Sequence, residues 1–166
     1  ISYEIIIVDN DSTLDEKSRL KHYCNDKNIS IIESATNLGF GKANNLGAQS
    51  ACGESLFFVN PDTYLINTAI KELFLFAKES NISTCGGNLY SAALQPIHSY
   101  WTLMPSVKAE LSALLSDIPL KVLHKNSHEH NLTNQPKEVA FITGADLMIL
   151  RSLFNQLDGF DKDFFM

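Results

Sequence analysis

Four consecutive aliphatic residues near the start of the chain, residues 5–8, are followed by the polar stretch "DNDST". An apolar run that is short, β-branched and stopped by turn residues predicts a buried β-strand. By the same criteria we expect further strands at residues 29–32, in "SLFFVNPDT", in "STCGGNLY" and on both sides of Gly144 in "EVAFITGADLMIL". Pro61 ends the strand in "SLFFVNPDT" because proline cannot donate to a ladder.

Between these strands the apolar residues recur with the period of an amphipathic helix, most clearly in "INTAIKELFLFAKES". We expect helices at residues 14–25, 42–51, 66–80, 107–115 and 151–157. Asp11 or Ser12 is expected to cap the first of them. Because strands and helices alternate, the sequence predicts an α/β fold with a mostly parallel sheet flanked by helices.

Composition narrows the class of protein. A chain of 166 residues with 45% apolar and 19% charged residues suits one domain with a sizeable core. The net charge of −6, with scattered basic residues, argues against nucleic-acid binding, which needs phosphate neutralisation. Three widely spaced cysteines suit a reducing compartment, and no apolar stretch is long enough to span a bilayer.

Two of the predicted strands end in a carboxylate. Asp9 follows the first strand, and Asp62 follows "SLFFVN". Parallel neighbours would place both at the carboxyl edge of the sheet, where open α/β sheets bind ligands. One carboxylate could hold the base or ribose of a nucleotide while the other holds Mg²⁺ or Mn²⁺ on its diphosphate, since these metals need few protein ligands when phosphates supply the rest.

Other chemistry also fits part of the pattern. Asp9, Asp11 and Thr13 match the Asp-x-Asp-x-Thr signature of haloacid dehalogenase-like phosphatases, in which the first Asp is the nucleophile. That chemistry also needs a later lysine and a second acidic pair at a strand end. The sequence has no strand-end Gly-Asp-x-x-x-Asp, so the phosphatase is an alternative hypothesis. "GFGKANNLG" fails both the dinucleotide and the P-loop spacing.

Three longer blocks carry a family resemblance. They are "EIIIVDNDSTLD", "NLGFGKANNLGAQSACGESLFFVNPDT" and "ITGADLMILRSLFNQLDGFDKDFFM". In this order the chain resembles the GT-A fold family 2 glycosyltransferases, and most closely their rhamnosyltransferase-like members. The resemblance implies an inverting, metal-dependent transfer of a sugar from a dTDP- or UDP-linked donor to a glycan or lipid-linked acceptor. A nucleotide-sugar-binding domain without catalysis is the other alternative.

The resemblance also implies an organisation for the chain. It predicts a single glycosyltransferase domain over residues 1–166, with a nucleotide-sugar-binding half at 1–90 and an incomplete acceptor half at 91–166. The family's first strand and helix would precede Ile1, and its Glu-Asp pair with the catalytic base would follow Met166. The implied setting is polysaccharide biosynthesis in the cytoplasm, with peripheral attachment to the inner face of the membrane as an option.

Site residues follow from the same resemblance. Asp9 corresponds to the residue that accepts a hydrogen bond from the donor's base, and Asp62 to the metal-binding carboxylate. Asn60 stands where the family's metal motif has its first Asp, so an amide replaces a carboxylate. Lys42 could contact phosphate or be a solvated lysine. The remaining residues line the nucleotide pocket (Asn37, Gly39 and Asn45) or the acceptor side (Thr143, Gly144 and Ala145).

Overall fold

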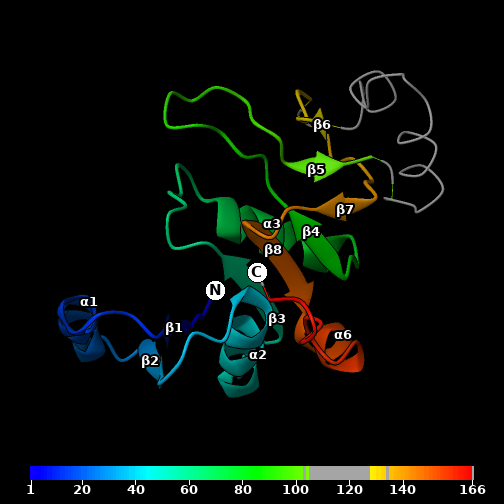
Figure 1. Ribbon diagram of the computed structural model, residues 1–166. Coiled ribbons are helices and arrows are strands. Elements are labelled where there is room, and N and C mark those ends of the chain that lie inside the picture. Colours follow the sequence, from blue (N-terminus) through cyan, green and yellow to red (C-terminus); the bar gives the residue numbers. More distant parts are fainter. Residues whose placement is uncertain (103, 105–127, 134, 166) are drawn as a thin grey trace, which may run out of the picture. The chain divides into compact units, whose positions relative to one another are not determined.

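A computed structural model describes residues 1–102, 104, 128–133 and 135–165 (Figure 1). The helix expected at 107–115 lies outside the described residues. The chain divides into two compact units. The first comprises Ile1–Phe58, Phe74–Thr84 and Met148–Met166, and the second comprises Val59–Leu73 and Cys85–Leu147. The expected division at residue 90 concerns function and stays a prediction.

The first unit begins with a pair of parallel strands. β1 (Ile5–Asn10) runs beside β2 (Ile29–Ser34), with Ile5 opposite Ile29 and Asn10 opposite Ser34. Helix α1 (Leu14–Leu20) and the 3₁₀ turn η1 (Lys21–Asn25) connect them. The helix expected at 14–25 therefore tightens into a 3₁₀ turn after Leu20. The predicted parallel pairing of these strands is confirmed.

The cap of α1 differs from the expectation that Asp11 or Ser12 provides it. Thr13 is the N-cap: its hydroxyl accepts from the Glu16 amide at 3.5 Å, and the Glu16 carboxylate accepts from the Thr13 amide at 2.9 Å. This is a capping box, and its Thr-x-x-Glu spacing satisfies two otherwise unpaired amides reciprocally. Asp11 instead adopts a left-handed φ of 72° in the turn that precedes the helix.

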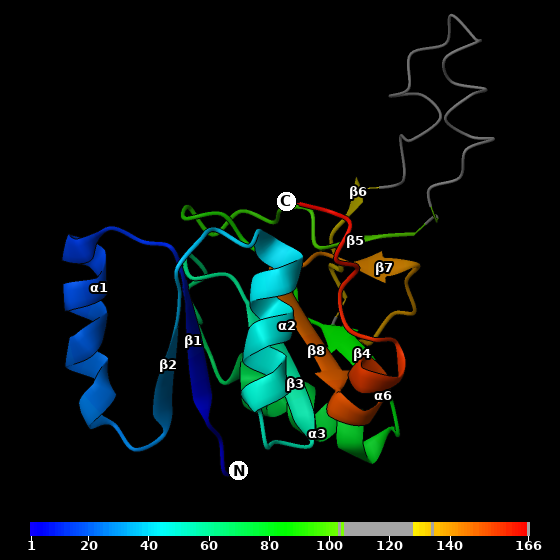
Figure 2. The same cartoon turned by 60° about the horizontal axis from the view of Figure 1, so that its bottom comes forward.

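Helix α2 (Phe40–Ser50) packs against β1. Figure 2 shows α2 beside β1, with α1 on the far side of β2. Its buried face consists mainly of small residues, which lets the helix approach the strand closely. A Cβ added at Gly47 would lie 3.0 Å from Cγ2 of Val8, so a side chain there would force the helix away from the strand.

Three further strands form a sheet in the order β3-β8-β4. They are β3 (Ser55–Val59), β4 (Thr84–Gly86) and β8 (Asp146–Leu150). Helix α3 (Ala69–Glu79) precedes β4, and α6 (Arg151–Gln156) follows β8 directly. These elements match the strands and helices that the apolar pattern predicts, with shorter bounds.

An aromatic cluster forms part of the core of the first unit. The Phe58 ring lies 5.0 Å from the rings of both Phe154 and Phe160. Phe160 also packs edge-on against Phe40 at 5.6 Å. Edge-to-face aromatic pairs of this kind add to the free energy gained from burying their area. The cluster joins β3, α6 and the start of α2, three elements that are far apart in the sequence.

The second unit contains a small antiparallel sheet, of which the sequence pattern predicted the strand before Gly144 but not the other two. β5 (Tyr100–Trp101) lies between β6 (His128–Glu129) and β7 (Phe141–Ile142). Strands of two residues are too short to show periodicity. The α/β class is confirmed. The described residues form three sheets: β1 and β2 pair in parallel, and β6, β5 and β7 pair antiparallel.

Asn45 joins α2 to the segment after α6. Its side-chain oxygen accepts from the Phe160 amide at 2.8 Å, and its side-chain nitrogen donates to the Phe160 carbonyl, also at 2.8 Å. Asn45 is buried. Gly159 precedes this contact with a φ of 77°, and a Cβ there would clash with the Asn45 amide. Only glycine meets both demands without strain.

We predict that Asn45→Ala lowers the free energy of unfolding by about 2–3 kcal/mol, because it leaves two backbone groups of Phe160 unpaired. Urea denaturation followed by circular dichroism would measure the change. Asn44→Ala is the matched control, since Asn44 donates only to the Phe40 carbonyl in its own helix. Equal losses for the two variants would contradict a special role for Asn45.

Candidate functional site

Asp9 lies at the carboxyl end of β1, and its side chain is 0% exposed. Its Oδ1 accepts from the Ser12 amide at 3.2 Å. Its Oδ2 lies 3.4 Å from Nζ of Lys17 in α1, yet it accepts no aligned hydrogen bond from the described residues. Asp9 therefore keeps one buried oxygen with acceptor capacity to spare.

The environment of Asp9 favours its charged form. Hydrogen bonding from Ser12 is the main cause that holds the pKa of Asp9 below its ordinary value of 3.8; burial opposes it, and Lys17 lowers the pKa further. A hydrogen bond or a positive charge beside a carboxylate stabilises its ionised form. Asp9 is thus an ionised acceptor at neutral pH, as its predicted role requires.

Asn10 organises the loop before α2. Its side-chain oxygen accepts from the Leu38 amide at 2.8 Å, and its side-chain nitrogen donates to Oδ1 of Asn37 at 3.0 Å. The same Asn37 oxygen accepts from the Gly39 amide at 2.9 Å. Two predicted site residues, Asn37 and Gly39, are therefore linked to the strand that carries Asp9. Sequence reasoning did not single out Asn10 for this task.

The N-terminus of α2 lies directly after this loop. Gly39 is its N-cap with a φ of 77°, and no side chain caps the helix there. Lys42 is exposed in the first turn. The predicted role of Lys42 toward phosphate stays a prediction. Asn45 has both of its amide atoms bonded to Phe160, and its predicted place in the nucleotide pocket stays a prediction.

In the second unit, the predicted metal motif and acceptor block meet. The Asn60 amide donates to the Ala145 carbonyl at 3.2 Å, and the Thr63 amide donates to the Asn60 carbonyl at 3.0 Å. The turn between these bonds presents Asp62, which is exposed. Gly144 is exposed as well, and the Thr143 hydroxyl is buried without a hydrogen bond in the described part of the chain.

The residues of this site fit the metal that the family resemblance implies only if the substrate supplies further ligands. Among the described residues no cluster of three or more His, Cys, Asp or Glu could hold a metal ion. Asp62 offers one carboxylate and Asn60 one amide carbonyl. Mg²⁺ and Mn²⁺ accept such sparse protein ligation when substrate phosphates and water complete the coordination. Asp62 and Asn60 would then hold the metal jointly with a diphosphate.

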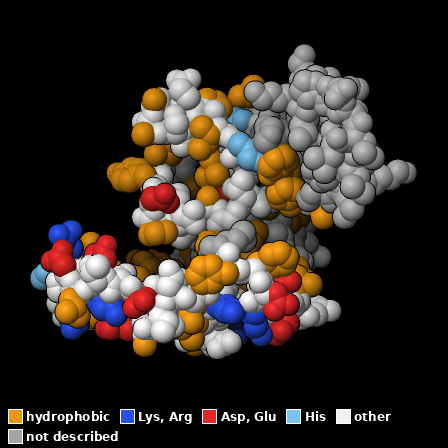
Figure 3. Space-filling view, in the orientation of Figure 1, with side chains coloured by type: hydrophobic (Ala, Val, Ile, Leu, Met, Phe, Trp, Pro, Cys, Tyr) orange, Lys and Arg blue, Asp and Glu red, His pale blue; other side chains and the backbone are white. Residues whose placement is uncertain are grey.

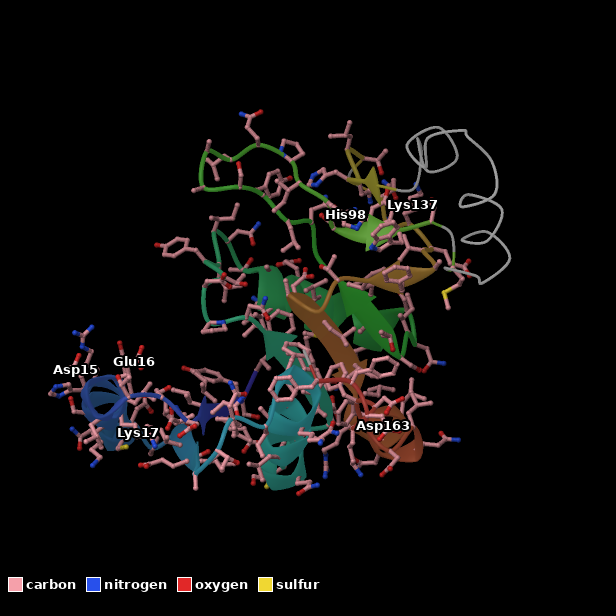
Figure 4. All side chains as sticks on the ribbon, viewed as in Figure 1. Asp15, Glu16, Lys17, His98, Lys137 and Asp163 are labelled. Carbon is pink, nitrogen blue, oxygen red and sulfur yellow. The ribbon has the colours of Figure 1, made fainter. Side chains whose placement is uncertain are left out.

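Asp9 belongs to the first unit and Asp62 to the second. The expectation that the two carboxylates face one cleft therefore stays a prediction. A hollow of about 320 Å³ lined by Leu157 to Lys162 lies in the first unit and contains none of the predicted site residues. Asp163, labelled in Figure 4, follows this segment.

The second unit also buries a carboxylate that sequence reasoning passed over. Asp146 follows the acceptor block at the start of β8 and is 6% exposed. One of its oxygens accepts from the Gly87 amide, and the other has no hydrogen bond among the described residues. Burial raises the pKa of Asp146 to about 6. The sequence signal that could have identified Asp146 is a charged residue within the otherwise apolar run "ADLMIL".

A carboxylate at a strand end, an uncapped helix N-terminus and an amide-rich loop between them are typical of α/β proteins that bind ligands at strand ends and helix N-termini. Comparison with known families agrees with this class. Residues 2–158 match Glycosyl transferase family 2. The chain belongs to this family, which confirms the family suggested by the three sequence blocks.

Known proteins support the same placement. The chain is 28% identical over 167 aligned residues to "Low-salt glycan biosynthesis hexosyltransferase Agl10" of Haloferax volcanii, covering 98% of this chain and 49% of that protein. It also resembles the crystal structure of S. aureus TarS 1-349, with a TM-score of 0.57 and 18% identity, over 98% of this chain and 42% of that one. The second likeness concerns the fold alone and agrees with the predicted GT-A class. The chain spans about half the length of the relative and less of the solved structure.

The buried Asp146 generates a prediction about pH. Its folded pKa of about 6 exceeds the ordinary 3.8, so the folded state binds this proton more tightly than the unfolded state. The contribution of protonated Asp146 to the free energy of unfolding is therefore fully present below about pH 4 and is lost as the pH rises through about 6. Asp146→Asn removes the buried charge and keeps a carbonyl for the Gly87 amide. We expect it to stabilise the chain by about 1–2 kcal/mol at pH 7.5, after allowing for solvent screening.

The gain from Asp146→Asn should shrink at pH 4, where the wild-type carboxyl is protonated. Thermal denaturation at both pH values would measure it. Glu138→Gln changes an exposed carboxylate of the same unit and serves as control. A gain of the same size at pH 4 and pH 7.5 would contradict the raised pKa.

Proposed function

We propose that this chain forms the nucleotide-sugar-binding and acceptor-facing parts of an inverting glycosyltransferase. The observation that carries the proposal is the Asp9 carboxylate, which is buried, ionised and left with one spare acceptor oxygen at a strand end. A nucleotide base with a ring N–H would satisfy that oxygen. Membership of Glycosyl transferase family 2 supports this assignment.

The proposed reaction is a displacement at the anomeric carbon of the donor sugar. The acceptor hydroxyl forms the new glycosidic bond, a carboxylate base takes the hydroxyl proton, and the nucleoside diphosphate leaves. One inversion of configuration results from one displacement. The acceptor would approach along Thr143, Gly144 and Ala145, which lie beside the Asn60–Asp62 turn through the hydrogen bond from Asn60 to Ala145.

Mg²⁺ or Mn²⁺ would neutralise the charge that develops on the leaving diphosphate. Asp62 and Asn60 are the residues that would hold it. The uncapped first turn of α2, with Lys42, is the proposed place for a phosphate, because helix N-termini favour anions. These three residues lie in the proposed donor half, residues 1–90, and the proposed acceptor half comprises residues 91–166.

The donor is proposed to be a UDP- or dTDP-linked sugar, and the acceptor a glycan or a lipid-linked glycan. The Haloferax volcanii relative, whose name describes a hexosyltransferase of glycan biosynthesis, supports this substrate class. No helix of the described residues is long and apolar enough to cross a membrane. We propose a role in polysaccharide biosynthesis in the cytoplasm, with peripheral attachment to the inner face of the membrane as the alternative.

The proposal predicts how nucleotide binding depends on metal. UDP should bind more tightly with Mn²⁺ or Mg²⁺ than with chelator, and Asp62→Ala should remove most of that difference because Asp62 is the carboxylate of its motif. Isothermal titration calorimetry with and without metal would measure both. Glu79→Ala, at the exposed end of α3, is the control.

Asp9→Asn tests the base-binding assignment in the same assay. It replaces the acceptor with a neutral amide and should weaken UDP binding with or without metal. Identical UDP binding by the wild type and Asp9→Asn would contradict the proposed site. Hydrolysis of simple phosphate esters that Asp9→Asn abolishes would instead favour the phosphatase alternative.

A further inference from the structure

Two neighbouring loops of the second unit expose large apolar side chains. The 61–68 loop follows β3, and the 87–99 hairpin lies between β4 and β5. Figures 1 and 2 both show the two loops side by side. The exposed apolar residues are Tyr64, Leu65 and Ile66 on the 61–68 loop, and Tyr90, Leu94 and Ile97 on the 87–99 hairpin. Apolar side chains that gather in this way on a surface indicate a docking site.

The apolar parts of both loops lack charged residues. The sequence has no Asp, Glu, Lys or Arg from residue 63 to residue 70, and none from residue 86 to residue 102. On the face that Figure 3 shows, acidic and basic side chains gather over α1 and near α6, whereas hydrophobic side chains prevail in the second unit. The two loops therefore offer apolar contact and no charge for a partner to complement.

The 87–99 hairpin pairs much of its own backbone. The Ser91 amide donates to the Gln95 carbonyl at 2.9 Å, and the Leu94 amide donates to the Ser91 carbonyl at 2.8 Å. At the base of the hairpin the Ile97 amide donates to the Leu89 carbonyl at 3.1 Å. Unpaired backbone groups are costly away from water. These internal bonds therefore lower the cost of moving the hairpin tip into a poorly hydrated environment.

Leu94 at the tip of the hairpin has a strained backbone. Its φ is 55°, in the left-handed region that glycine adopts without cost, and its side chain is 62% exposed. Glycine at this position would serve the turn better. Backbone strain gathers at sites of binding, so this outlier points to a role for the Leu94 side chain outside the fold.

Both loops begin beside the acceptor block, residues 143–145. The Ser99 carbonyl, at the end of the hairpin, accepts from the Thr143 amide at 3.3 Å. The Asn60 amide, directly before the 61–68 loop, donates to the Ala145 carbonyl at 3.2 Å. A partner that covers the apolar loops therefore lies next to the place where the acceptor hydroxyl is proposed to enter.

We propose that the tips of the 61–68 loop and the 87–99 hairpin insert their apolar side chains into the interfacial region of a lipid bilayer. This inference rests on the proposed function, because a lipid-linked acceptor carries its hydroxyl close to a bilayer surface. Tyrosine is enriched at membrane interfaces, and leucine and isoleucine gain free energy at the boundary of the acyl chains. A stable protein partner would bury about 800 Å² of each surface, whereas these loops present narrow tips.

The test is flotation of the chain with vesicles of phosphatidylcholine, which have no net charge. The wild type should float with these vesicles, and its affinity should change little with salt concentration because the inserted residues carry no charge. Vesicles that also contain phosphatidylglycerol should bind it no more tightly, since the chain itself has a net charge of −6.

Leu94→Gly separates docking from folding. Glycine adopts a φ of 55° without strain, so the variant should remain folded in urea denaturation. It should bind phosphatidylcholine vesicles about tenfold more weakly, because an inserted leucine side chain is lost. Tyr64→Ser should weaken binding as well. Leu14→Ser is the matched control, since Leu14 is 87% exposed but lies on α1 in the first unit, and it should float as the wild type does.

Three outcomes would overturn the docking surface. The first is a wild type that does not float with phosphatidylcholine vesicles, and the second is flotation that neither Leu94→Gly nor Tyr64→Ser weakens. The third is flotation with anionic vesicles alone that salt abolishes, because charge elsewhere on the chain would then drive binding. Self-association in analytical ultracentrifugation that Leu94→Gly abolishes, without flotation, would instead assign the loops to contact between two copies of the chain.

Calorimetry of UDP binding with Mn²⁺ keeps this proposal distinct from the proposed function. Leu94 is not among the proposed donor-site residues, so Leu94→Gly should bind UDP as the wild type does. A wild type that binds UDP but does not float keeps its donor site and overturns the docking surface alone. Flotation that depends on Leu94, without UDP binding, would support the docking surface and contradict the donor site.

Discussion

The double hydrogen bond between Asn45 and the backbone of Phe160 is the contact on which the first unit most depends. It joins residues 115 positions apart in the sequence, and Asn45 is buried. The bond holds Phe160 against Phe58 and Phe40, so the same contact that satisfies buried amides also completes the aromatic cluster. The N-terminus of α2, where a phosphate is proposed to bind, is set by this packing.

Two buried carboxylates show how the fold decides chemistry. Asp9 and Asp146 are both almost fully buried and both lie at strand ends. Asp9 has hydrogen bonding from Ser12 and the charge of Lys17, so its pKa is lowered. Among the described residues Asp146 has one backbone hydrogen bond and no ion pair, so burial prevails and its pKa is raised to about 6. The first is prepared to accept a hydrogen bond as an anion, and the second is close to being neutral.

The residues proposed for function are distributed over loops that rigid elements support. Asn10, at the end of β1, holds the loop between β2 and α2 through hydrogen bonds to Asn37 and Leu38, while Asn60 and Ala145 connect a turn to the acceptor block. Binding residues on loops are common because the backbone at strand ends is free to meet a ligand. The sparse donor set at Asp62 explains why the family's metal would have to be shared with the substrate's diphosphate.

Sequence alone determined the strands and helices with strong periodicity, the α/β class, the family and the position of Asp9 at the end of a strand. Those features depend on local patterns of apolar residues, on turn residues and on contiguous motifs. Tertiary structure alone decided that Asn45 bonds to Phe160, that Lys17 pairs with Asp9, that Asp146 is buried, and that Tyr100 and Phe141 belong to an antiparallel sheet. Each of these features depends on contacts between residues that are distant in the sequence or on the path of the backbone through a turn. No local pattern records such pairings, because the free energy that selects them comes from burial and from satisfying buried polar groups in three dimensions.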